Sequence, residues 1–148
     1  MFTDILNHPI RSEYDLSSLK YAVVGGSPVT PSLVRQSQKL LDIKIAVGYG
    51  MTENTCGTFM VPHGSNMDVT CNTVGLPFPG LEAKIIDLDE NTLERGQIGE
   101  IVTKGHAVFR GYVGEIQKTN ESFTKDDYWK TGDLALIRED GYLQLGQV

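Results

Sequence analysis

The feature that most constrains the fold is a strand, helix and strand pattern in the first third of the chain. The apolar run Tyr21–Val24 ends at two glycines, as a buried strand ends at a tight turn. Thr30 is suited to cap a helix and Pro31 to begin it. Ile43–Val47 reads as a second strand with both faces covered. This pattern predicts a β-α-β unit with parallel strands. The expected apolar stripe of the helix comprises Leu33, Val34, Leu40 and Leu41.

The pattern changes near residue 74, after which short apolar runs alternate with glycine turns. Leu81–Ile85 alternates apolar and polar residues, and the pair Asp140-Gly141 predicts a hairpin near the end of the chain. Several short strands with glycine turns are typical of a small barrel or sandwich. We therefore predict an α/β fold, with a β-α-β, parallel-sheet portion over residues 1–73 and a small antiparallel β-barrel-like subdomain over residues 74–148.

Composition excludes some classes of protein. The chain has 13 Lys and Arg against 19 Asp and Glu, a net charge of -6, so we do not expect a nucleic-acid-binding surface. No run approaches eighteen apolar residues, so no transmembrane segment is expected. Cys56 and Cys71 fit no zinc spacing and indicate reduced thiols in an intracellular protein, with a disulfide as the alternative. The sequence does not distinguish cytosol, mitochondrion and peroxisome.

Three short motifs could carry chemistry, and each also has a plain structural interpretation. Gly25–Pro28 would let a flat ligand approach the backbone, or is a simple strand-to-helix turn. Tyr49–Glu53 combines a ring for stacking, a hydroxyl for phosphate and a carboxylate for Mg²⁺, or is a loop in which Glu53 begins a helix. Trp129–Asp133 ends in a carboxylate at a strand start. This carboxylate could accept hydrogen bonds from both hydroxyls of a ribose, or it could belong to a turn Asp that bonds its own backbone.

The order and spacing of the motifs resemble the adenylate-forming superfamily of acyl-CoA synthetases, luciferases and peptide-synthetase adenylation domains. The motifs are Gly25-Gly26-Ser27-Pro28, Tyr49-Gly50-Met51-Thr52-Glu53, Val74-Gly75-Leu76-Pro77, Gly99-Glu100-Ile101, Gly111-Tyr112, Trp129-Lys130-Thr131-Gly132-Asp133 and Asp140-Gly141-Tyr142. The stretch Gly114–Thr119 is most similar to the medium-chain acyl-CoA synthetase branch. The resemblance implies that the chain is an inner segment of the large N-terminal domain of such an enzyme.

The resemblance also implies a reaction and roles for individual residues. A carboxylic acid, in this branch a fatty acid, attacks ATP to give an acyl-adenylate and pyrophosphate, and CoA then displaces AMP. By this resemblance, Gly26, Ser27 and Pro28 form an adenine-facing loop, Tyr49 lies on the other face of the ring, and Gly50 and Met51 complete the nucleotide-binding set. Thr52 would bond the α-phosphate, Glu53 would hold Mg²⁺, and Asp133 would take the ribose hydroxyls. A cation and fixed donors suit a reaction in which charge grows on phosphate.

Departures from the family pattern lead to competing hypotheses. The lysine-bearing phosphate loop and the mobile C-terminal domain of the family have no counterpart in these 148 residues, and Gln147 stands where the family has a ribose-contacting Arg. Glutamine has neither the charge nor the fork of a guanidinium. The sequence thus predicts a truncated acid–CoA ligase without ligase activity of its own. The alternatives are a non-catalytic AMP-binding module and an interaction protein that self-associates through an apolar sheet face.

Overall fold

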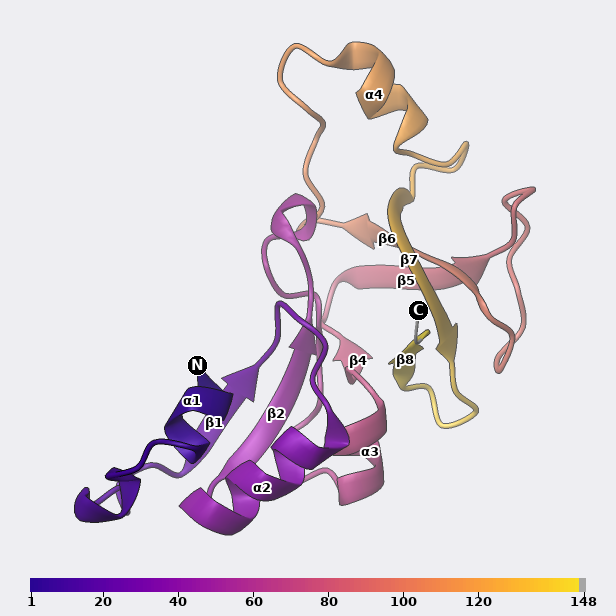
Figure 1. Cartoon of the computed structure of the whole chain (residues 1–148). Coiled ribbons are helices and arrows are strands. Elements are labelled where there is room, and N and C mark those ends of the chain that lie inside the picture. The colour runs from indigo at the N-terminus through magenta and orange to yellow at the C-terminus, as the bar shows by residue number, and fades with distance from the viewer. Residues whose placement is uncertain (147–148) are drawn as a thin grey trace.

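A computed structural model describes residues 1–146, in which strands form two sheets of four (Figure 1). The first sheet has the order β1 (Tyr21–Val24), β2 (Lys44–Tyr49), β3 (Phe59–Met60) and β4 (Leu76–Pro77). The second has the order β5 (Leu81–Ile86), β6 (Gly99–Gly105), β7 (Trp129–Ile137) and β8 (Leu143–Leu145). The helices are α1 (Phe2–Leu6), α2 (Pro31–Leu41), α3 (Met67–Asn72) and α4 (Ile116–Glu121), with 3-10 turns at Arg11–Glu13 and Thr52–Asn54.

The predicted β-α-β unit is confirmed. β1 and β2 pair in parallel, with Tyr21 opposite Lys44, and α2 connects them. Thr30 caps α2, because its hydroxyl accepts a hydrogen bond from the backbone N–H of Leu33 at 3.2 Å. The expected stripe is wrong at one position: Leu40 is exposed, and the α2 residues that are buried are Val34, Ser37 and Leu41.

The first sheet is covered on one face. Ile45, Val47 and Tyr49 are buried in the same core as residues of α2 and α3. On the opposite face, Tyr21 and Val23 remain 61% and 62% exposed. The expectation that both faces of these strands are covered is therefore wrong within residues 1–146, because alternate residues of β1 and β2 point away from the helices.

The second sheet is antiparallel throughout and curls as the sequence predicted for a barrel-like portion (Figure 1). The Asp140-Gly141 pair lies in the hairpin between β7 and β8, also as predicted. β7 begins at Trp129, so the third motif lies inside a strand. Its pairing with β6 is irregular: Glu100 faces Leu134 but Val102 faces Lys130, so extra residues of β7 bulge between them.

The two sheets share a continuous core. The backbone of Leu143 in β8 exchanges hydrogen bonds with Val74 and Gly75, at 2.8 and 2.9 Å, just before β4. β4 itself extends the first sheet to Pro77. The division of the chain at residues 73 and 74 stays a prediction. Among residues 1–146, no helix combines the length and apolar character needed to cross a bilayer.

Candidate nucleotide site

The loops that follow β1 and β2 lie at the same end of the first sheet, because the strands are parallel. Gly25 packs tightly here: a Cβ at this position would lie 2.5 Å from the carbonyl oxygen of Gly48. Gly26 has a φ of +78°, which favours glycine. Ser27 and Pro28 are exposed. The close approach of Gly25 therefore brings the first predicted motif against the strand that leads into the second.

A hydrogen bond joins the second and third motifs. The phenol of Tyr49 donates to Oδ2 of Asp133 at 2.6 Å, although the two residues are 84 positions apart. Tyr49 is 8% exposed. Burial raises the pKa of Tyr49 well above its usual value, and the hydrogen bond to the Asp133 carboxylate raises that pKa further. The phenol is therefore a protonated donor at neutral pH.

The bulge in β7 positions Asp133. Gly132 has a φ of +78°, and its N–H donates to Oε1 of Glu100 at 2.9 Å. The hydroxyl of Thr131 donates to the carbonyl of Ile101 at 2.8 Å and accepts from the N–H of Asp133 at 3.1 Å. The sequence placed Asp133 at a strand start, which is wrong: it lies within β7, where the irregular register turns it toward Tyr49.

The loop after β2 folds back on itself. The N–H of Met51 donates to Oδ1 of Asn54 at 2.7 Å, and the carbonyl of Met51 accepts from Cys56 N–H at 2.9 Å. Gly50 lies against Gly57, where a Cβ would come within 2.7 Å of the Gly57 backbone. Thr52 is exposed at the start of the short 3-10 turn. Both free thiols of the chain, Cys56 and Cys71, are unbridged, as predicted.

Glu53 is held at both its backbone and its side chain. Its carbonyl accepts from the N–H of Phe109 at 2.7 Å, and its Oε1 accepts from the phenol of Tyr112 at 2.9 Å. Within the part of the chain that the structure describes, no group of three or more His, Cys, Asp or Glu residues is arranged to hold a metal ion. A cation at Glu53 would therefore rely on one carboxylate together with phosphate and water oxygens, as Mg²⁺ commonly does.

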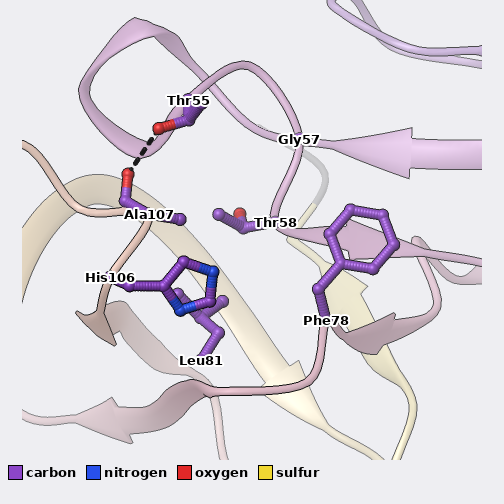
Figure 2. Close-up of a pocket in the computed structure, with 7 residues that line it drawn as sticks. All are labelled: Thr55, Gly57, Thr58, Phe78, Leu81, His106 and Ala107. Carbon is purple, nitrogen blue, oxygen red and sulfur yellow. Dashed lines mark hydrogen bonds between the residues drawn. The ribbon is translucent and has the colours of Figure 1, made fainter.

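A pocket of about 270 Å³ lies next to this loop and was missed by the sequence analysis (Figure 2). Its lining residues are Thr55, Gly57, Thr58, Phe78, Leu81, His106 and Ala107. One side is fixed by the hydroxyl of Thr55, which donates to the carbonyl of Ala107 at 2.7 Å. The hydroxyl of Thr58 is buried and has no hydrogen-bond partner among residues 1–146. The histidine at position 106 carried no spacing signal that could have revealed this pocket.

The predicted site residues are thus brought together to different degrees. Tyr49 and Asp133 are in direct contact, and Gly50, Met51, Thr52 and Glu53 continue from Tyr49 along one loop. Gly26, Ser27 and Pro28 are connected to that loop through the packing of Gly25 on Gly48. Gln147 lies outside the described residues.

The fold is that of a mixed α/β protein, in which a sheet with a parallel β-α-β unit packs against a curled antiparallel sheet. The candidate site lies where the loops after β1 and β2 meet β7. Comparison with known families identifies the protein further. The chain belongs to the AMP-binding enzyme family, whose model matches residues 1–113.

Individual relatives agree with this family. Medium-chain acyl-CoA ligase ACSF2, mitochondrial, of Bos taurus is 38% identical over 98% of this chain, and a long-chain-fatty-acid–CoA ligase of Salmonella typhimurium is 34% identical over 98%. The chain spans about a quarter of the length of these relatives, 24% and 25%. Among solved structures, apo MatB from Rhodopseudomonas palustris has a TM-score of 0.82 at 29% identity, covering 97% of this chain and 28% of MatB. Amide bond synthetase McbA from Marinactinospora thermotolerans has a TM-score of 0.87 at 28% identity, and the match covers 99% of this chain and 29% of McbA.

Proposed function

We propose that this chain is the adenylate-binding segment of an AMP-forming acid–CoA ligase acting on a fatty acid. The observation that carries the proposal is the contact between Tyr49 and Asp133, two motif residues far apart in sequence. The family match and the acyl-CoA ligase relatives support the reaction class. Relatives that are named as mitochondrial enzymes support an intracellular location.

In this proposal each loop contacts one part of the adenylate. The exposed residues Gly26, Ser27 and Pro28 would contact one face of the adenine and Tyr49 the other, and Asp133, which accepts from the Tyr49 phenol, would take the ribose hydroxyls. Because the phenol already donates to Oδ2 of Asp133, the carboxylate is fixed in orientation before ribose binds. Its remaining lone pairs can accept hydrogen bonds from the ribose hydroxyls. Preorganised acceptors cost less to order when a ligand binds.

Thr52 and Glu53 would act at the phosphate end. The exposed hydroxyl of Thr52 can donate to an α-phosphate oxygen, and the carboxylate of Glu53 can hold Mg²⁺ together with phosphate oxygens. The cation would supply charge stabilisation as the acid oxygen attacks phosphorus and pyrophosphate leaves. ATP, the acid and CoA are then the substrates of the whole ligase.

Calorimetry with AMP tests the nucleotide site directly. We expect saturable heat from the 148-residue chain, and binding weakened about tenfold or more in Asp133→Asn, because a carboxylate accepts stronger hydrogen bonds than an amide. Asp89→Asn makes the same charge change on an exposed turn and should bind as the unaltered chain does. A non-hydrolysable octanoyl-adenylate mimic should bind more tightly than AMP if the acid is fatty. Equal binding by both variants, or no heat in any sample, would contradict the proposal.

A further inference from the structure

Residues 105–112, a segment distant in sequence, form hydrogen bonds with Glu53 and with the loop that carries it. This segment crosses the loop after β2 and contacts it at three points. Thr55 donates to the carbonyl of Ala107, the N–H of Phe109 donates to the carbonyl of Glu53, and the phenol of Tyr112 donates to Oε1 of Glu53. The first contact holds the Thr55 side chain of the loop, the second holds the backbone of Glu53, and the third fixes the side chain of Glu53.

Tyr112 is itself held firmly. Its N–H donates to the hydroxyl of Thr119 at 2.9 Å, and Gly111 packs against the same side chain, where a Cβ would lie 2.5 Å from Cγ2 of Thr119. The ammonium of Lys118 lies 4.2 Å above the Tyr112 ring, and the ring of Phe109 meets it edge-on with centroids 4.8 Å apart. The phenol therefore reaches Glu53 from a ring that is fixed by its backbone, by α4 and by an aromatic neighbour.

From this geometry we propose that Tyr112 is a positioning residue that holds the Glu53 carboxylate in place for a divalent cation. The proposal rests on the proposed function, because the cation is the one that would accompany the nucleotide. One carboxylate oxygen accepts a hydrogen bond from the phenol, so a cation would bind a side chain that is already oriented. A single carboxylate is a weak cation site, and freezing its rotamer in advance removes part of the entropy cost of binding.

The chain offers a matched control for this contact. Tyr128 also donates its phenol to a carboxylate, Oε2 of Glu82, at 2.8 Å, and a lysine, Lys84, lies 4.4 Å above its ring. Tyr112→Phe and Tyr128→Phe each remove one hydroxyl and keep the ring. A general effect of losing a surface tyrosine–carboxylate pair would appear in both variants, whereas an effect on Glu53 should appear in Tyr112→Phe alone.

The first readout needs no ligand. Side-chain couplings measured by NMR report the χ1 rotamers of Glu53 in the isotopically labelled chain. We expect one dominant rotamer in the unaltered chain and in Tyr128→Phe, and averaging among rotamers in Tyr112→Phe. An unchanged rotamer distribution in Tyr112→Phe would overturn the proposal, whatever the chain binds.

The second readout is Mn²⁺ affinity in the presence of ATP, followed by electron paramagnetic resonance. We expect Tyr112→Phe to weaken Mn²⁺ binding roughly two- to tenfold, the range of one ordinary hydrogen bond. The same substitution should have no further effect in the Glu53→Gln background. A loss that persists in that background would overturn the positioning role. If no variant binds Mn²⁺ with ATP while the rotamer readout behaves as expected, the proposed function fails and the hold of Tyr112 on Glu53 stands.

Discussion

The pairing of Tyr49 with Asp133 gives the phenol a role beyond its ring. The sequence suggested an aromatic face for stacking on adenine, and that role remains a prediction. The structure adds that the hydroxyl end of the side chain reaches a carboxylate in the second sheet at 2.6 Å. A buried donor of this kind both fixes the carboxylate and ties two sheets together across the candidate site.

The pH dependence of stability should reveal this contact. In the folded chain the pKa of Tyr49 is raised above its ordinary value of about 10, chiefly by burial and then by Asp133, whereas unfolding returns it to that value. The folded state therefore keeps a proton that the unfolded state loses. The contribution to stability is complete below about pH 10 and declines as the pH rises above it.

Urea unfolding of the unaltered chain and of Tyr49→Phe measures this contribution. At pH 8 we expect Tyr49→Phe to lower the free energy of unfolding by about 1 kcal/mol, the size of one hydrogen bond. By pH 11 the difference between the two proteins should shrink, because the variant has no phenol to ionise at this position. An identical difference at both pH values would show that the Tyr49 phenol is not held as described.

A closely packed glycine allows β4 to approach β3. Gly75, just before β4, has a φ of +93°, and a Cβ there would fall on the backbone carbonyl of Met60 in β3. Gly64 has a similar φ of +83° but opens onto free space. A side chain at position 64 would therefore cause backbone strain alone, whereas a side chain at position 75 would cause the same strain and also a clash with β3.

Alanine at these two glycines should have unequal effects. Gly64→Ala should cost about 1 kcal/mol of stability, because an L-residue at positive φ is mildly strained. Gly75→Ala should cost at least about 2 kcal/mol more, since β3 and β4 must also separate. Thermal or urea unfolding gives both values. Equal losses would mean that the approach of β4 to β3 does not depend on glycine at position 75.

The sequence predicted the elements better than their junctions. The Thr30 cap, the helix that follows it and the Asp140-Gly141 hairpin depend on local chemistry, and all were predicted correctly. The bulge that aims Asp133 at Tyr49 depends on pairing between β6 and β7, which no local pattern encodes. The contact of Tyr112 with Glu53 spans 59 positions and is not encoded by any local pattern, although Gly111-Tyr112 is one of the sequence motifs.

Within the part of the chain that the structure describes, one face of β1 is apolar and uncovered. β1 is at the edge of its sheet, and the side chains of Tyr21 and Val23 remain exposed on the face opposite α2. An exposed apolar strand edge is a template for pairing with another chain. We therefore expect the 148-residue chain to self-associate through this face.

Light scattering coupled to size-exclusion chromatography tests the association. The apparent mass should rise with concentration in the unaltered chain, and Val23→Lys should bring it back to that of the monomer. Leu88→Lys adds the same charge at a fully exposed leucine far from β1 in sequence, and should leave the association unchanged. A monomer at all concentrations, or equal effects of the two lysines, would rule out β1 as the contact.

We expect the loops after β1 and β2 and the bulged part of β7, which are separated in sequence, to surround one nucleoside monophosphate. Backbone NMR of the labelled chain during titration with AMP tests it most directly. We predict saturable shifts, with one common affinity, at Ser27, at Thr52 and Glu53, and at Asp133. Shifts confined to one of these three segments, or centred on the pocket lined by Phe78 and His106, would show that they do not form one nucleotide site.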